Sequence, residues 1–158
     1  METVIRPIVE TDLTDLMAMM LEFAAYEDLA SYFTVTEQRL RTAMFGPAAF
    51  VEGSIALADG TAAGYALYYP AFSSFRGERG LFLEDLFIRE AYRGSNLGER
   101  MLREIARSAR LRGFERIDLQ VLDWNAPAIN FYLKHGAERN DDERHFKFAG
   151  DAFARLAS

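Results

Sequence analysis

The sequence predicts a mixed α/β fold in which helices cover both faces of one sheet. Short apolar strand patterns dominate the middle of the chain, amphipathic helical patterns flank them, and one strand–helix–strand crossover follows. The chain has 158 residues, of which 50% are hydrophobic and 27% charged. This is an ordinary globular balance at the size of one compact domain, so we expect a single domain over residues 1–158.

The N-terminal elements are a short strand and two helices. Val4–Ile8 has strand character, and Pro7 inside it suits the edge of a sheet. Thr11 is expected to cap a helix whose apolar residues recur at helical spacing from Leu13 to Ala24. A second helix is expected to start at Thr36 and to end near the Gly-Pro pair at 46–47.

Three strands are expected in the middle of the chain. Ser54–Ala58 and Ala62–Tyr69 flank the Asp59-Gly60 pair, which is a strong hairpin turn signal. Leu81–Ile88 is nearly continuous in its apolar character except for the adjacent acids at 84 and 85. Such a run is typical of a buried strand.

The C-terminal third alternates helices and strands. An amphipathic helix runs from Leu97 and stops at Gly113, and Arg116–Leu122 returns as a strand. Pro127 opens a short helix that ends at Gly136. We expect a last strand at 146–149 and a final helical turn from residue 151.

Charge and composition exclude several classes of function. Twenty-four acids against eighteen bases give a net charge of −6, which repels nucleic acid and favours a cationic partner. Cysteine is absent, which excludes a thiolate nucleophile, and with only His135 and His145 we expect no metal site. No apolar run reaches the roughly 18 residues of a membrane span. The first residues lack a signal-peptide layout, so a cytoplasmic protein without membrane contact is expected.

The junction between the strand at 81–88 and the helix at 97 predicts an anion site. A buried strand runs into a loop of small residues, Arg93–Gly98, which opens a long helix. Such a junction directs unpaired backbone N–H groups and the positive helix end to one point, and Arg93 adds a charged donor. The alternative is a tight turn that merely requires glycines.

This loop resembles the pyrophosphate loop of the GCN5-related N-acetyltransferases. The family pattern is Arg or Gln, two residues, Gly, one residue, then Gly or Ala, and Arg93-Gly94-Ser95-Asn96-Leu97-Gly98 follows it except at Asn96. Asparagine is the non-glycine residue that best tolerates a left-handed backbone, so the loop can keep its shape.

The resemblance extends over nearly the whole chain and is strongest to the diamine (spermidine/spermine) acetyltransferase branch. The similar segments are Ile5–Pro7, Tyr26-Glu27, Tyr68-Tyr69, Phe82–Asp85, Tyr92–Gly94, Trp124–Tyr132 and His135–Ala137. Two segments depart from that branch. Residues 73–75 lack its acid before a tryptophan, and residues 140–145 are shorter and lack a tryptophan.

The resemblance implies the fold and the cosubstrate. The fold would be a mixed, mostly antiparallel sheet with a splayed parallel strand pair, Leu81–Ile88 and Arg116–Leu122, with acetyl-CoA in the wedge between them. The cofactor contacts would come from Leu86, Phe87 and Ile88 (pantetheine), from Arg93, Gly94, Ser95, Asn96, Leu97, Gly98 and Glu99 (diphosphate), and from Asn125, Ala126, Pro127 and Ala128 on the other side. The family also implies a homodimer.

Two residues are the candidates for proton transfer. An alkylammonium has a pKa of about 10.4, so a base must remove its proton before it can attack. Glu84 lies in an apolar strand where desolvation is expected to raise its pKa, and it matches the family's base. Tyr132 matches the family's general acid, with core packing as the alternative. Since neighbours on a strand point to opposite faces, only one of Glu84 and Asp85 is expected to serve a given pocket.

The substrate side is inferred chiefly from the resemblance. Tyr26 and Glu27 match substrate-contacting positions, and Tyr68, Tyr69, Phe72 and Phe75 are candidates to wall the pocket or to pack in the core. We expect an acetyl-CoA-dependent N-acetyltransferase that acts on a primary amine of a small cationic molecule (a diamine, a polyamine or a thialysine-like amine) by direct attack in a ternary complex. The alternatives are a protein or peptide N-acetyltransferase and a non-catalytic CoA-binding regulatory module.

Overall fold

The computed structural model describes all residues, 1–158, and the chain forms two compact units, Met1–Gln120 and Val121–Ser158. The first unit holds a five-stranded sheet in the order β1-β2-β3-β4-β5. Neighbouring strands are antiparallel except β4 and β5, which are parallel. The strands are β1 (Thr3–Pro7), β2 (Glu52–Ala58), β3 (Thr61–Ser73), β4 (Glu78–Ile88) and β5 (Arg116–Leu119). The predicted mixed, mostly antiparallel sheet with one parallel pair is therefore confirmed.

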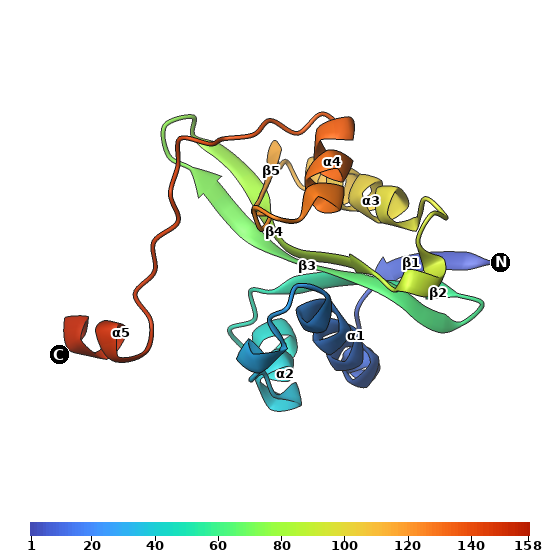
Figure 1. The fold of residues 1–158 in the computed structure, drawn as a ribbon, viewed down its shortest axis with the longest axis horizontal. Coiled ribbons are helices and arrows are strands. Elements are labelled where there is room, and N and C mark those ends of the chain that lie inside the picture. Colours follow the sequence, from blue (N-terminus) through green and yellow to red (C-terminus); the bar gives the residue numbers. More distant parts are fainter. The chain divides into compact units, whose positions relative to one another are not determined.

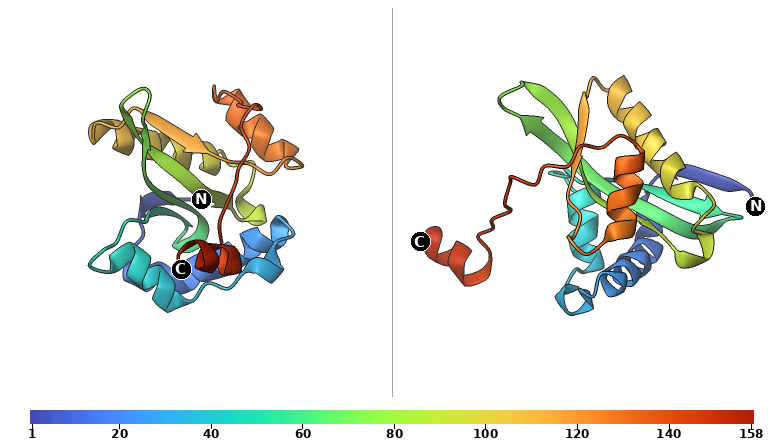
Figure 2. Two further views of the ribbon diagram at one scale, coloured as in Figure 1. Left: turned by 90° about the vertical axis from the view of Figure 1, so that its left-hand side faces the viewer. Right: turned by 45° about the horizontal axis from the view of Figure 1, so that its top comes forward.

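Helices cover both faces of this sheet, as predicted. The first unit contains α1 (Leu13–Tyr26), α2 (Glu37–Phe45) and α3 (Leu97–Leu111). Helices α1 and α2 lie against one face and α3 lies against the other (Figures 1 and 2). Each helix buries one apolar stripe. In α3 the buried residues Leu97, Met101, Ile105 and Ala109 recur every fourth position, the spacing at which side chains share a helix face.

The starts of α1 and α2 are organised by different side chains. The predicted cap at Thr11 is wrong, because a 3-10 turn (Glu10–Asp12) precedes α1 and no side-chain cap is made there. Asp12 instead accepts the Val9 N–H at 2.8 Å and pairs with Arg6 at 2.7 Å. The hydrogen bond from Arg6 is the main cause that lowers the pKa of Asp12. For α2 the predicted cap is confirmed, since Thr36 Oγ1 accepts the N–H of residue 39.

Two local features of the sheet were predicted from the sequence. Pro7 ends β1 at the sheet edge. Asp59 and Gly60 join β2 to β3 with φ angles of 47° and 80°. Positive φ at both central residues defines the hairpin turn that an Asp-Gly pair favours. The sequence therefore determines this connection locally.

The parallel pair is short, which leaves part of β4 without a strand on one side. Pairing between β4 and β5 covers only Gly80–Leu83 opposite Arg116–Leu119. Strand β5 ends three residues before the predicted Leu122, whereas β4 continues to Ile88. The unpaired stretch of β4 therefore lies where the wedge was predicted.

The second unit contains α4 (Ala126–Lys134) and α5 (Gly150–Leu156). The helix expected from Pro127 is confirmed, and Asn125 caps it by accepting the Ala128 N–H at 3.3 Å. Residues 137–149 contain neither helix nor strand, so the strand expected at 146–149 is wrong. Its apolar pattern found no strand partner, and Phe146 stays 86% exposed. No helix of the chain is long and apolar enough to cross a membrane.

Candidate active site

A β-bulge brings two acids to one face of the sheet. Leu67 pairs with Asp85 but the next residue of β3, Tyr68, pairs with Leu83, so Glu84 is an extra residue in β4. An extra residue interrupts the alternation of side chains. The expectation that the two acids point to opposite faces is therefore wrong.

Tyrosines from one face of β3 bind both acids. Tyr65 and Tyr69 are four residues apart on β3 and so share a face. The Tyr65 hydroxyl donates to Asp85 Oδ2 at 2.9 Å, and the Tyr69 hydroxyl donates to Glu84 Oε2 at 3.2 Å. The two carboxylates therefore lie on the face of β3 that carries these tyrosines, and the pockets that contain them are also lined by residues of α1 or α2.

Two acids that line these pockets, Asp85 and Glu27, have raised pKa values. The pKa of Asp85 is raised to about 6, chiefly by burial and also by the charges of Glu84 and Glu27, while the Tyr65 hydrogen bond acts in the opposite direction. Burial also raises the pKa of Glu27. Glu84 itself is exposed, so the expectation that it is desolvated is wrong. The predicted base, Glu84, and Glu27 are thus both near enough to Asp85 for their charges to raise its pKa.

An acidic pocket of about 210 Å³ contains two of these acids. Its walls come from α1, from the segment after α1 and from the middle of the sheet. They are Met20, Phe23, Ala24, Glu27, Leu29, Tyr32, Phe33, Tyr65 and Asp85. The predicted substrate residue Glu27 thus lies in a pocket with Asp85 and aromatic rings, an environment suited to a cation.

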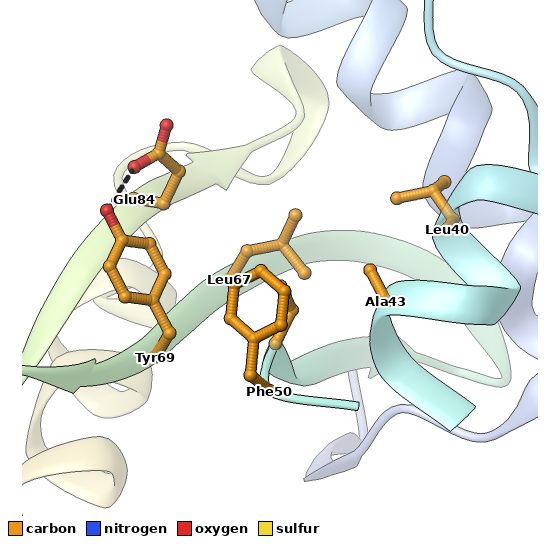
Figure 3. A pocket seen from close by; sticks show the side chains of 7 residues that line it. Leu40, Ala43, Phe50, Leu67, Tyr69 and Glu84 are labelled. Carbon is orange, nitrogen blue, oxygen red and sulfur yellow. Dashed lines mark hydrogen bonds between the residues drawn. The ribbon is translucent and has the colours of Figure 1, made fainter. Parts of the chain in front are cut away.

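An apolar pocket of about 350 Å³ contains the third acid. Its walls come from α2, from the segment after α2 and from β3 and β4. They are Leu40, Ala43, Phe50, Val51, Leu67, Tyr69 and Glu84. Figure 3 shows Glu84 and Tyr69 joined by their hydrogen bond on one side of this pocket, with Leu40 and Ala43 facing it from α2.

The loop before α3 has the backbone shape predicted for an anion site. Gly94 and Asn96 both have positive φ, 79° and 59°, and Asn96 lies in the left-handed region immediately before the helix. The expectation that asparagine adopts this conformation is confirmed. A side chain added at Gly94 would meet no atom within 4 Å, so the space beside the loop is open. Ser95 closes the turn by donating to the Tyr92 carbonyl at 2.5 Å.

Arg93 joins this loop to the end of α1. Its Nε donates to the Ile88 carbonyl at 3.0 Å, and its guanidinium lies over the Tyr26 ring, 4.9 Å from the centroid. The structure therefore brings together a residue predicted for the diphosphate and one predicted for the substrate. In this arrangement Arg93 also fixes the end of β4 against the loop.

Residues 15–137 match the Acetyltransferase (GNAT) family. The chain belongs to this family. Thialysine N-epsilon-acetyltransferase of Mus musculus is 34% identical over 98% of the chain and 97% of that protein, and the Bos taurus protein of the same name is 32% identical over 97% and 96%. L-ornithine N5-acetyltransferase of Arabidopsis thaliana is 38% identical over 63% of the chain but only 44% of its own length. The resemblance seen in the sequence is confirmed.

Solved structures support the fold of this acetyltransferase. An integron cassette protein from the mobile metagenome of V. cholerae has a TM-score of 0.82 at 22% identity, covering 99% of this chain and 98% of its own. An aminoglycoside acetyltransferase from a soil metagenomic sample, in complex with sisomicin, has a TM-score of 0.77 at 15% identity, covering 93% and 95%. At these identities the likeness shows the fold. The family assignment makes the chain a GNAT-type N-acetyltransferase that uses acetyl-CoA.

The residues of this acetyltransferase fit the cosubstrate. Beyond Leu83, no strand pairs with β4 on the side of β5, so backbone groups of the predicted residues Leu86, Phe87 and Ile88 have an open edge beside them. Leu97, Gly98 and Glu99 form the first turn of α3, where N–H groups have no intrahelical acceptor. The extended pantetheine arm of acetyl-CoA matches the open edge of β4, and its diphosphate matches the N-terminus of α3.

The remaining predicted residues lie in the second unit. Asn125 is 3% exposed and caps α4, and Ala126, Pro127 and Ala128 form the first turn of that helix. Tyr132 is half-buried on α4, and its ring lies edge-on to that of Phe131 with centroids 5.1 Å apart. No group of three or more histidine, aspartate and glutamate side chains is placed to hold a metal ion.

The candidate aromatic wall is smaller than the sequence suggested. Tyr69 lines the apolar pocket, but Tyr68 is buried with its hydroxyl 2.9 Å from Ser54 Oγ. Phe72 and Phe75 are exposed at the far end of β3 and in the turn that follows. Sequence reasoning missed Tyr65, although the alternation of Tyr65 and Tyr69 on one strand face was a signal that could have found it.

Proposed function

We propose that this acetyltransferase transfers the acetyl group of acetyl-CoA to a primary amine of a small cationic molecule such as a diamine, a polyamine or a thialysine-like amine. The observation that carries the proposal is that Glu84 and Asp85 of β4 lie on one face of the sheet and that Glu27, at the end of α1, shares a pocket with Asp85. A net charge of −6 favours such acceptors. Relatives named for thialysine and ornithine, which are amines with further charged groups, also support it.

The acidic pocket would hold a second positive charge of the acceptor. Glu27 lies at the C-terminal end of α1, where the helix dipole disfavours a carboxylate, and burial raises its pKa as well. Asp85 shares the same pocket. A bound ammonium group would offset the repulsion between these acids and favour their ionised forms.

The reacting nitrogen would lie at Glu84, the exposed acid of these three. At pH 7 only about one alkylamine in 10³ is unprotonated, so removing this proton addresses a barrier of about 4–5 kcal/mol. The neutral nitrogen attacks the thioester carbonyl, the carbon–sulfur bond breaks, and Glu84 keeps the ammonium proton. Tyr132 would protonate the departing thiolate. The chain contains no cysteine, which supports direct attack without a cysteine-bound acyl intermediate.

The cosubstrate contacts follow the predicted residues. Leu86, Phe87 and Ile88 would pair through their backbone with the pantetheine arm, and the loop from Gly94 to Glu99 would hold the diphosphate. Arg93 and the segment from Asn125 to Ala128 would complete the site. The homodimer and the cytoplasmic location expected from the sequence stay predictions.

The proposal is tested by measuring CoA release from acetyl-CoA with each of a panel of amines. A thiol reagent reports only the product, because the protein has no thiol of its own. We expect turnover with putrescine, spermidine, thialysine or ornithine in the presence of acetyl-CoA, and much less with a peptide whose only amine is a lysine side chain. Turnover with the peptide alone would indicate a protein acetyltransferase. Silence across the panel, with CoA bound in a calorimeter, would indicate a binding module and contradict the proposal.

A further inference from the structure

We propose that the apolar pocket is a second acceptor subsite, which takes the uncharged aromatic group of an arylalkyl amine such as phenethylamine. The inference rests on the proposed function, because it places the amine of this second acceptor class at the same Glu84. It adds a substrate class that carries one positive charge instead of two.

The charge of the pocket argues against a second ammonium group there. Of its seven lining residues, Glu84 is the sole acid, and the reacting nitrogen would occupy it. Four of the other lining residues are aliphatic: Leu40, Ala43, Val51 and Leu67. Burying a further charge among these side chains without a partner is costly, whereas burying apolar surface is favourable. The pocket therefore suits the uncharged part of a monoamine.

The aromatic walls favour a ring. Phe50 is 62% exposed, and its ring lies edge-on to that of Tyr69, with centroids 6.4 Å apart and planes at 69°. Tyr69 is stacked on Phe82 at 5.4 Å. A flat ligand beside Phe50 and Tyr69 would extend this row of rings with the offset or edge-on geometry that aromatic pairs prefer.

The position of the pocket connects it to the chemistry. Tyr69 donates a hydrogen bond to Glu84 at 3.2 Å, so the aromatic wall and the predicted base are in direct contact (Figure 3). An amine joined to a ring by a short alkyl chain could place its nitrogen at Glu84 while the ring contacts Phe50. At about 350 Å³ the pocket also lies in the usual size range of small-molecule sites, roughly 300–1,000 Å³.

The two pockets share no lining residue, so each can be blocked separately. Each has one alanine on a helix, Ala43 on α2 and Ala24 on α1, and both are half-buried. We would measure KM for phenethylamine and for putrescine in the wild type, in Ala43→Phe and in Ala24→Phe, at saturating acetyl-CoA. Ala43→Phe is expected to raise KM for phenethylamine at least about tenfold and that for putrescine less than about threefold, since a filled pocket excludes its ligand. Ala24→Phe is expected to raise KM for putrescine at least about tenfold and KM for phenethylamine less than about threefold.

Several outcomes decide the inference. If the wild type acetylates putrescine but not phenethylamine, or if Ala43→Phe affects both amines equally, the second subsite is wrong and the proposed function stands. If neither amine is acetylated and the wider panel is also silent, the proposed function itself has failed. Thermal unfolding controls for folding. Should Ala43→Phe not fold, Phe50→Ala is the replacement, because this exposed ring can be removed without a core cavity, and an unchanged KM for phenethylamine in that variant would overturn the inference.

Discussion

The acidic and apolar pockets are built by the same plan and differ in charge. Each is formed by one helix, the segment that follows that helix, and a β3–β4 tyrosine–carboxylate pair. The segment after α1 contributes Glu27, whereas the segment after α2 contributes Phe50. Both pockets therefore present an acid to a ligand, but only the acidic one can bind a second cation.

Under the proposed function, the residues that select the acceptor are separate from the predicted base. Glu84 belongs to the apolar pocket and influences Asp85 of the acidic pocket by its charge. A single predicted base can thus serve acceptors bound on either side. A dicationic acceptor, putrescine, and a monocationic acceptor, phenethylamine, distinguish the two pockets in the experiments below.

The largest effect is expected for the group that both pockets share. Glu84→Gln keeps an acceptor for the Tyr69 hydroxyl but cannot take a proton, so kcat should fall by about 10²-fold or more with both amines, the usual contribution of a positioned base. Steady-state CoA release measures it, and Glu22→Gln, which removes an acid paired with Arg89 outside both pockets, is the control. Full activity of Glu84→Gln would remove this residue from catalysis.

Tyr132→Phe is expected to lower kcat by a comparable factor, on the order of 10²-fold, because it removes only the hydroxyl that would protonate the thiolate. The loss should be the same for putrescine and phenethylamine, since this step follows attack by either amine. An acyl donor with a more acidic thiol should reduce the defect. A variant that turns over normally would assign Tyr132 to packing against Phe131.

A smaller and selective effect is expected at Glu27. Glu27→Gln removes a charged partner of the distal ammonium, so KM for putrescine should rise about 10- to 100-fold, equivalent to the roughly 1.5–3 kcal/mol of a charged hydrogen bond. KM for phenethylamine should change less than about threefold, because this residue does not line the apolar pocket. Equal effects on the two amines would erase the distinction between the pockets.

The pH dependence of KM should also differ between the two acceptors. The pKa of Asp85 is raised to about 6 and that of Glu27 is raised too, so lowering the pH through this range protonates the acidic pocket. KM for putrescine should rise several-fold between pH 7.5 and about pH 5.5, beyond any change for phenethylamine. Asp85→Asn should flatten this additional rise. Parallel profiles for the two amines in the wild type would contradict the assignment of the second charge to Asp85.

The smallest effect concerns stability. Because the folded pKa of Asp85, about 6, lies above its ordinary value of 3.8, its stabilising contribution is complete below pH 3.8 and is lost as the pH rises through 6. Asp85→Asn removes this loss and can still accept the Tyr65 hydrogen bond. Relative to the wild type, the variant should gain about 1–2 kcal/mol in the free energy of unfolding at pH 8 and almost nothing near pH 4. Urea unfolding at both pH values measures it, and a pH-independent difference would contradict the raised pKa.

Local features were predictable from the residues themselves. The apolar spacing of α1 and α3, the Asp-Gly turn at residues 59–60 and the left-handed Asn96 each depend on the conformational preferences of a few adjacent residues. The backbone shape of the loop before α3 was therefore predictable. Where a pattern needed a distant partner, prediction failed: the apolar residues at 146–149 indicated a strand, but no strand lies beside them.

The family, the helices, the turns and the shape of the loop before α3 were predictable because they depend on local spacing and on side-chain chemistry, while anion binding by that loop stays a prediction. What the acids at 84 and 85 face could not be read from the residues beside them. Their shared face results from a bulge that β4 adopts against β3, and the raised pKa of Asp85 results from packing beneath α1. Pairing register and burial are properties of two or more chain segments at once, which is why no single stretch of sequence contains them.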